Sequence, residues 1–290
     1  REQVLNSIAL RADDDKKYIQ PQKQCADIVA RFREVSGRTN LEFVLKTGRG
    51  KKLVEALKEV YDKQNDFVNL CRRLAGDEDL VEHRGGNVSY KYNDKFVITA
   101  SGAKLKEVTV FKNYYVDGCG DTRPSMETEM HKKLGAVVAH THPYYVNIIL
   151  CSNEAEEIIH DLFDTYDYEF IEYKTPGKKL SDLIKENKKP CVLFLQNHGL
   201  VVSSLSFEDA WKTTKKISER CKSWLDARAK ETRGSKVFGA VFPDAIVYKE
   251  NLDLNKEIIL FMESCGLTPK YLMPMEVKEI KEMEEEKYRS

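Results

Sequence analysis

Five short β-like runs, separated by helical stretches, constrain the fold of this chain more than any other feature of its sequence. They lie between about residues 61 and 230 and are rich in the β-branched and aromatic residues that favour strands. Helices and strands that alternate in this way bury their apolar faces against each other, so the pattern predicts an α/β sandwich with an internal sheet. The five runs are GNVSYKY, KFVITAS, AVVAHTHP, YEFIEYK and CVLFLQNHGLVVS.

Two helical patterns accompany these runs. The stretch Phe207–Ala229 predicts a long helix. An earlier amphipathic helix is predicted to begin after the basic loop KTGRGKK and to end near Gly76. The apolar positions of the earlier helix, spaced by three, four and seven residues with one gap, are Leu53, Leu57, Val60, Phe67, Cys71 and Leu74, and those of the long helix are Ala210, Thr214, Ile217 and Cys221.

The chain divides into three predicted zones. Residues 1–60 are charged and mostly helical in pattern, and we expect a helical N-terminal extension there. Residues 61–230 form the predicted core domain. Residues 231–290 form a predicted C-terminal tail that packs on the domain or between subunits. In this tail, VFPDAIVYK predicts a strand and MPMEVKEIKEMEEEKYR a terminal charged helix.

Composition excludes several classes of partner and compartment. The 47 basic and 47 acidic residues cancel, so no overall charge attracts nucleic acid or an acidic membrane surface. The seven cysteines include no C-x-x-C pair, which favours a reducing compartment over a disulfide framework. No apolar run approaches the about 20 residues that span a bilayer, and no secretory signal is evident. We therefore expect a cytoplasmic protein of ordinary globular size.

Two histidines stand in one of the most apolar segments, AVVAHTHPYYVNIIL. If Ala136–His142 is a strand, His140 and His142 lie on one face, about 6.5–7 Å apart, where they can share a divalent cation. His198 follows a second apolar strand and precedes Gly199, which permits a tight turn. Three neutral histidines with an open position are typical of a catalytic zinc site, which Co²⁺, Mn²⁺ or Fe²⁺ can also occupy.

The alternative interpretation is that these histidines are core residues satisfied by hydrogen bonds. A buried histidine is more often structural than a ligand, H-x-H arises by chance, and two strands need not be neighbours. His160, in the helical stretch EEIIHDLF, is expected to be structural.

A carboxylate precedes the histidine segment in TRPSMETEMHKK. On a helix that starts near Ser125, Glu127 and His131 share one face at a spacing of four residues. Glu127 beside a metal is a candidate proton carrier, and a low dielectric would raise its pKa toward neutrality. Ser125 is alternatively a helix N-cap, and Glu129 is expected to face solvent.

Two glycine-rich stretches can present backbone N–H groups to an anion. They are HRGGNVSY at residues 83–90 and TASGAK at residues 99–104, although such residues also form ordinary turns. The loop KTGRGKK does not fit a phosphate-binding P-loop, because no glycine stands five positions before Gly50 and Lys52 replaces the required Ser or Thr.

In this order, the segments resemble the class II aldolase/adducin family, with rhamnulose-phosphate and fuculose-phosphate aldolases as the most similar member types. The resemblance covers about residues 61–230 and implies a three-layer αβα sandwich around a mixed, largely antiparallel sheet. Met126 departs from the pattern of fuculose-phosphate-type members, which carry a second serine there. The matching motifs are GGNVS (85–89), TASG (99–102), PSMETEMH (124–131), AVVAHTHP (136–143) and LFLQNHGL (193–200).

The resemblance also implies a site and an assembly. A zinc-type ion would be held by His140, His142 and His198, and Glu127 would be the acid/base residue. Members of the family are typically cyclic tetramers with active sites between subunits. The residues implied around a substrate phosphate are Asn87, Ser101, Gly102 and Ser125.

The leading hypothesis is a metal-dependent aldolase, a carbon–carbon lyase that cleaves a phosphorylated ketose through a metal-stabilised enediolate. The same site would also suit a sugar-phosphate epimerase, a dehydratase or a decarboxylase. A further alternative is a non-catalytic, adducin-like interaction module. The presence of three histidines and Glu127 favours an enzyme, with a small sugar phosphate as its partner.

Overall fold

The chain forms two compact units in this computed structural model, Arg1–Asn65 and Asp66–Ser290. Most of the loop KTGRGKK and the last residues of the charged tail lie outside the described residues. The predicted limits of the three zones, 1–60, 61–230 and 231–290, stay predictions. None of the described helices is long and apolar enough to cross a membrane. The structure describes residues 28–35, 38–45, 51–81, 85–119, 121–230, 239–248 and 251–283.

The described part of the first unit begins with a β-hairpin rather than a helix. Strand β1 (Ile28–Val35) pairs antiparallel with β2 (Arg38–Leu45). Among the described residues, the expected helical part of the extension starts at Lys51, and Ile28–Val35 and Arg38–Leu45 are strands. The sequence alternates apolar and polar residues with a period of two here, and the register places Ala30 opposite Phe43. The predicted amphipathic helix follows as α3 (Lys51–Ala75), and it stops at Gly76 as expected.

The second unit is built on a seven-stranded sheet with the strand order β5-β4-β3-β6-β9-β8-β7. All neighbouring pairs are antiparallel except β7 and β8, which are parallel. The predicted mixed, largely antiparallel sheet is confirmed. Its strands are β3 (Asn87–Tyr92), β4 (Lys95–Thr99), β5 (Tyr114–Val116), β6 (Val137–Thr141), β7 (Tyr168–Ile171), β8 (Cys191–Leu195) and β9 (Gly199–Ser204).

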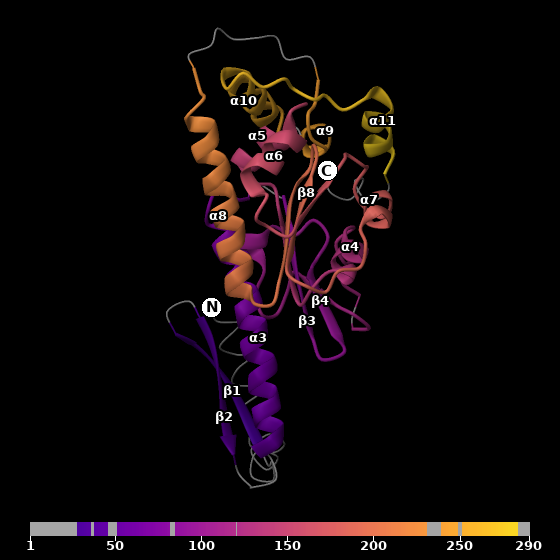
Figure 1. The fold of residues 1–290 in the computed structure, drawn as a ribbon. Coiled ribbons are helices and arrows are strands. Elements are labelled where there is room, and N and C mark those ends of the chain that lie inside the picture. Colours follow the sequence, from indigo (N-terminus) through magenta and orange to yellow (C-terminus); the bar gives the residue numbers. More distant parts are fainter. Residues whose placement is uncertain are drawn as a thin grey trace, which may run out of the picture. The chain divides into compact units, whose positions relative to one another are not determined.

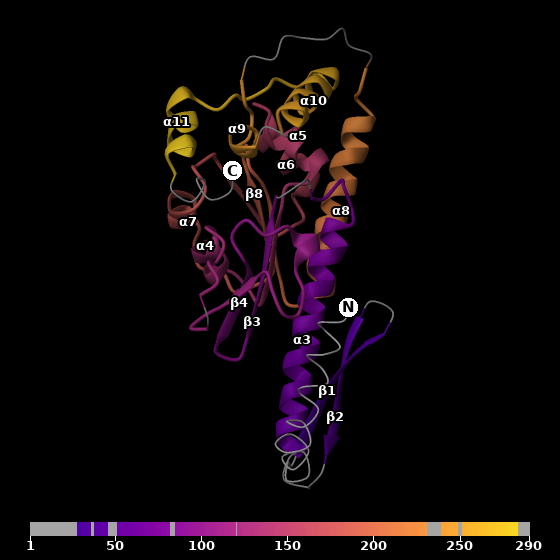
Figure 2. The same ribbon diagram turned by 180° about the vertical axis from the view of Figure 1, so that it is seen from behind.

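Alternating residues of the central strands face two separate apolar layers. Val138 and Val201 pack with the layer under α4 and α7, whereas Val202 and Phe194 pack with the layer under α5, α6, α8 and α10. Helices therefore cover both faces of the sheet (Figures 1 and 2), which confirms the three-layer αβα sandwich. The covering helices are α4 (Thr128–Lys133), α5 (Tyr144–Leu150), α6 (Ala155–Phe163), α7 (Lys178–Leu183), α8 (Phe207–Asp226) and α10 (Asn251–Ser264), and a 3-10 turn, η3, spans Leu105–Glu107.

The segment after residue 238 belongs to the core of this unit. Val241, Phe242 and Ala245 are buried among residues of α5, α8 and α10. The predicted strand VFPDAIVYK is wrong, because the structure places helix α9 (Asp244–Val247) there. Pro243 before the helix and Asp244 in its first turn are helix-start signals that outweigh the apolar content. The predicted terminal helix is present as α11 (Pro274–Glu282).

The two-layered core makes a matched stability test possible on α8. Leu225 is fully buried in the α5–α8–α10 layer, whereas Leu205, just before α8, is 68% exposed. We expect Leu225→Ala to lower the free energy of unfolding by about 2–5 kcal/mol, because it removes buried methyl groups and leaves a cavity. Leu205→Ala should change it by less than about 0.5 kcal/mol. Urea denaturation of both variants is the measurement, and equal losses would contradict this packing.

Candidate metal centre

The sheet brings the three predicted histidines to the same end of two adjacent strands. His140 is the fourth residue of β6, where it pairs with Asn87 of β3 on one side and Val201 of β9 on the other. His142 lies just past the end of β6. His198 lies in the tight turn between β8 and β9, a turn that Asn197 opens with a φ of 54°. Antiparallel pairing of β6 with β9 therefore places all three rings together.

Gly199 permits the close approach of that turn to β6. A Cβ atom at this position would lie 2.5 Å from the carbonyl oxygen of Thr141 and 2.8 Å from Cδ2 of His142. Real side chains do not tolerate such distances, so any other residue would push the two strand ends apart. The glycine is needed here for space rather than for backbone freedom.

The three imidazoles face a common centre. The Nε2 atoms of His140 and His142 are 3.1 Å apart, and one ring nitrogen from each histidine lies within 4.8 Å of the other two. In a tetrahedral zinc site with Zn–N bonds of about 2.0–2.1 Å, ligand nitrogens lie about 3.4 Å apart. The donor set therefore needs only small side-chain adjustments to hold one ion.

Hydrogen bonds on the far side of two rings set which nitrogens keep a lone pair. His140 Nδ1 faces the carbonyl oxygen of Leu200 at 3.1 Å, and His142 Nδ1 faces Oδ2 of Asp244 at 3.1 Å. Both oxygens only accept, so each Nδ1 carries a hydrogen, and Nε2 is the nitrogen of each ring that faces the common centre.

Glu127 adds a carboxylate to the same centre. It is the N-cap residue of α4 and is buried, with Oε2 3.3 Å from His140 Nε2 and Oε1 3.3 Å from His198 Nε2. The side-chain amide of Asn87 donates a 2.7 Å hydrogen bond to Oε2 and holds the carboxylate in place. Three imidazoles and one carboxylate thus converge on one buried point.

The electrostatics of this cluster favour neutral rings and an ionised carboxylate. Burial lowers the pKa of His140, and it lowers the pKa of His198 to about 3. Burial acts to raise the pKa of Glu127, but His140, His198 and the Asn87 amide outweigh it and hold that pKa well below its usual range. The expectation of a raised Glu127 pKa is therefore wrong, because the glutamate lies among polar groups rather than in an apolar pocket.

The residues predicted around a phosphate come from strand β3 and two adjacent loops. Ala100 bridges Pro124, and the N–H of Ser101 donates to the carbonyl of Arg123, so the turn after β4 lies against the segment that leads into α4. Gly102 has a φ of 73° with open space around it. Ser125 is buried, and its Oγ accepts from the N–H of Glu127 at 3.3 Å. Asn87 belongs to β3 beside this turn, but its amide is engaged by Glu127.

His131 lies four residues after Glu127 and is fully buried. Its Nδ1 is 2.7 Å from Oγ of Ser89, and its Nε2 has no hydrogen-bond partner among the described residues. Burial lowers the pKa of His131 to about 3, so the ring is neutral. Glu129 faces solvent as expected and pairs with Lys132 at 3.4 Å.

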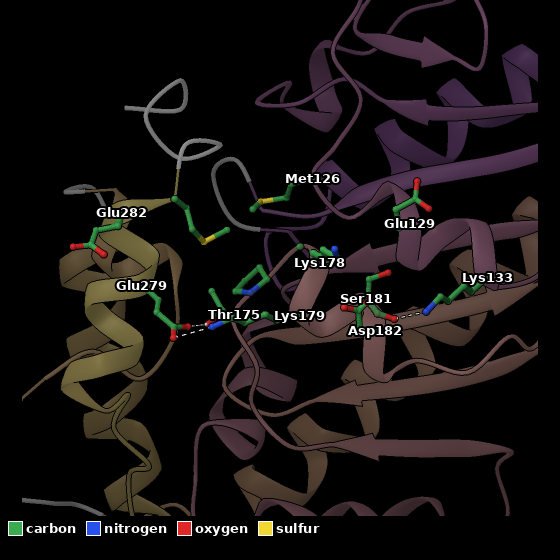
Figure 3. A pocket seen from close by; sticks show the side chains of 13 residues that line it. Met126, Glu129, Lys133, Thr175, Lys178, Lys179, Ser181, Asp182, Glu279 and Glu282 are labelled. Carbon is green, nitrogen blue, oxygen red and sulfur yellow. Dashed lines mark hydrogen bonds and ion pairs between the residues drawn. The ribbon is translucent and has the colours of Figure 1, made fainter.

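A separate cavity of about 680 Å³ lies between α4, α7 and α11 (Figure 3). Met126 reaches it, but Glu127 and the three histidines do not line it. Two of its lysines have polar partners: Lys179 contacts Glu279 at 2.8 Å, and Lys133 donates to the carbonyl oxygen of Ser181 at 2.6 Å. The described metal centre is therefore not part of this cavity.

Two residues that hold the histidines in place could not be identified from the sequence. Asp244 contacts His142, and Asn197 anchors the turn that carries His198, yet neither belongs to a recognised ligand pattern. The only sequence feature that singles out Asp244 is the Pro-Asp pair at the start of α9. That pair predicts a helix start, but it does not predict contact with His142, which lies about a hundred residues earlier in the chain.

A family model described as the Class II Aldolase and Adducin N-terminal domain matches residues 65–225, more than half of the chain. The chain belongs to the class II aldolase/adducin family.

Named relatives are distant. YuxG of Bacillus subtilis (strain 168), an uncharacterized oxidoreductase, is 29% identical over 122 residues, which are 40% of this chain and only 17% of YuxG. The L-fuculose phosphate aldolase of Methanococcus maripaludis is 26% identical over 174 residues, covering 53% of this chain and 91% of that protein. The solved L-fuculose-1-phosphate aldolase of Thermus thermophilus is 16% identical, covers 57% of this chain and 93% of its own, and has a TM-score of 0.45.

The close approach of the turn at Gly199 to the end of β6 can be tested by adding a single methyl group at this position. We expect Gly199→Ala to weaken metal binding about tenfold or more, because it displaces His142 and the end of β6, and to cost about 1–3 kcal/mol of stability. Gly118→Ala is the control, since a Cβ at Gly118 meets nothing within 4 Å and adds only the strain of its φ of 71°. Metal titration and urea unfolding measure both effects. Unchanged metal affinity in Gly199→Ala would contradict the geometry.

Proposed function

We propose that this protein is a metal-dependent aldolase that cleaves a phosphorylated ketose by a retro-aldol reaction. The observation that carries the proposal is the convergence of three imidazoles and one carboxylate on one buried point. A His₃ arrangement with an open position suits a catalytic ion. Membership of the class II aldolase/adducin family supports the same chemistry.

His140, His142 and His198 would hold the ion, and we propose Zn²⁺, with Co²⁺, Mn²⁺ or Fe²⁺ as possible replacements. When bound, the ion supplies a Lewis acid that stabilises the negative charge developing on substrate oxygens as the carbon–carbon bond breaks. The neutral state of His140 and His198 leaves their nitrogens available without prior loss of a proton.

Glu127 would transfer the proton to and from the substrate carbon at which the carbon–carbon bond is broken or formed. The Glu127 carboxylate is ionised, because its pKa lies below the usual range, and it can therefore accept a proton from that carbon in the condensation direction. In the cleavage direction the same group returns the proton. The Asn87 amide orients the carboxylate for this transfer.

The substrate phosphate would lie against the loops that carry Ser101, Gly102 and Ser125. The open left-handed turn at Gly102 and the neighbouring backbone N–H groups support an anion site, and the bond from Ser101 N–H to Arg123 aligns the two loops. The relatives named L-fuculose phosphate aldolase act, by name, on a ketose phosphate, which supports this class of substrate here. Met126 removes one hydroxyl expected from the fuculose-type pattern.

Assembly and compartment are part of the proposal. We propose a homotetramer with active sites between subunits, by resemblance to the family. The balanced charge and unpaired described cysteines support a cytoplasmic protein that binds neither nucleic acid nor membrane.

Elemental analysis tests the metal centre directly. We expect about one zinc-like ion per chain in the purified or reconstituted protein, and its loss in His140→Ala, because a buried ligand and its lone pair are removed. His160→Ala is the matched control, since His160 lies exposed on α6. No stoichiometric metal in the unmodified protein, even after reconstitution, would contradict the proposal and favour an adducin-like interaction module.

Replacement of the acid/base residue separates chemistry from metal binding. We expect Glu127→Gln to retain the ion, since the three histidines remain, and to lower kcat for cleavage of ketose phosphates by about 10²–10⁴-fold. Product aldehyde is measured with a coupled assay over a panel of ketose phosphates. Glu129→Gln, on the solvated face of α4, should leave the rate unchanged.

Retention of full activity in Glu127→Gln would exclude the assigned role. Turnover of a sugar phosphate without carbon–carbon cleavage would favour an epimerase, a dehydratase or a decarboxylase instead.

A further inference from the structure

The segment that follows the family-matched residues reaches back to the metal centre. We propose that Asp244 is a positioning residue that holds His142 in its metal-binding tautomer, so that the chain beyond residue 238 is a working part of the centre. This inference rests on the proposed metal site, and it assigns a role to a residue outside the matched region 65–225.

The contact between Asp244 and His142 is direct and largely shielded. Oδ2 of Asp244 lies 3.1 Å from Nδ1 of His142, and both side chains are only 14% exposed. The carboxylate accepts the Nδ1–H, which leaves the Nε2 lone pair facing His140 Nε2 at 3.1 Å. A carboxylate behind a metal-binding histidine fixes the ring orientation and increases the basicity of the ligand nitrogen.

Packing holds the Asp244 carboxylate in place. Asp244 begins α9, and Phe242 and Ala245, on either side of it in sequence, are buried in the core layer with α5 and α10. The side-chain amide of Asn251 donates to the backbone carbonyl of Asp244 at 3.4 Å. The aspartate is therefore held by core packing where it meets the imidazole.

The same segment also anchors the loop of a second histidine. The side-chain amide of Asn197, the residue before His198, donates to the carbonyls of Val241 and Lys270, each at 2.7 Å. The N–H of Val241 in turn donates to the side chain of Asn255 at 2.9 Å. Val241 and Lys270 thus bind the turn that carries His198, and Asp244 binds the ring of His142.

The two histidines have different hydrogen-bond acceptors because they lie at different positions relative to the sheet. His140 lies inside a strand, and a backbone carbonyl of the neighbouring strand, that of Leu200, orients its ring. His142 lies past the end of β6, beyond the last residue that pairs with β9. The acceptor there is a carboxylate from another part of the chain, that of Asp244 at the start of α9.

The test compares two isosteric changes in the same segment. Asp244→Asn can turn its NH₂ toward Nδ1 and so stabilise the wrong tautomer, which places a hydrogen on Nε2. We expect the dissociation constant for Co²⁺ or Zn²⁺, measured by competition with a chelator, to rise about 10–100-fold. Asp253→Asn is the matched control, because Asp253 is exposed on α10 and should leave the constant unchanged within about twofold.

A second readout does not need the metal. Nitrogen NMR of the metal-free protein, about two pH units above the usual histidine pKa of about 6.5, reports which nitrogen of His142 carries the hydrogen. We expect Nδ1–H in the unmodified protein and in Asp253→Asn, and a substantial Nε2–H population in Asp244→Asn. Urea unfolding shows that the variants remain folded.

The outcomes separate this inference from the proposed function. Unchanged metal affinity and an unchanged His142 tautomer in Asp244→Asn would overturn the role of Asp244 while leaving the metal site intact. If the unmodified protein binds no metal, the proposed function fails, and the NMR tautomer alone decides whether Asp244 positions His142.

Discussion

The convergence of three imidazoles and one carboxylate on one buried point organises the centre of this protein. The Nε2 atoms of His140 and His142 lie 3.1 Å apart, and the ionised carboxylate of Glu127 approaches both His140 and His198. Each of these polar groups would be costly to bury alone, because it would lose its hydrogen bonds to water. Together they satisfy one another and form a ligand set that suits a divalent cation.

The surrounding fold supplies what that centre requires on its outer side. The sheet provides a carbonyl for His140 and the amide of Asn87 for Glu127, and Gly199 lets the β8–β9 turn come close enough for His198 to join. Helices on both faces bury the strands, so the strand ends are held firmly against each other (Figure 1). A rigid sheet with short loops at one end is a suitable frame for a site that tolerates little displacement.

Much of this organisation was predictable from the sequence, and the failures have physical reasons. Strands with strong β-branched runs, such as β6 and β8, and the long amphipathic α8 were predicted because periodicity and burial agree there. The hairpin of β1 and β2 was not predicted, because many charged residues interrupt its alternation of apolar and polar positions. The segment VFPDAIVYK was predicted as a strand because its apolar residues favour a strand, although the Pro-Asp pair favours a helix start. The pKa of Glu127 was predicted in the wrong direction, since its shift depends on neighbours that only the folded chain provides.

By itself, the sequence determined the family, the α/β class and the identity of the three histidines and the glutamate, because these depend on residue types, local periodicity and motif order. Only the tertiary structure decided which atoms meet: Asn87 with Glu127, Leu200 with His140, and Asp244 with His142. These contacts join residues 40, 60 and about a hundred positions apart. Pairing across the sheet and packing of α9 on the core bring them together, and neither is encoded in any short stretch of the chain.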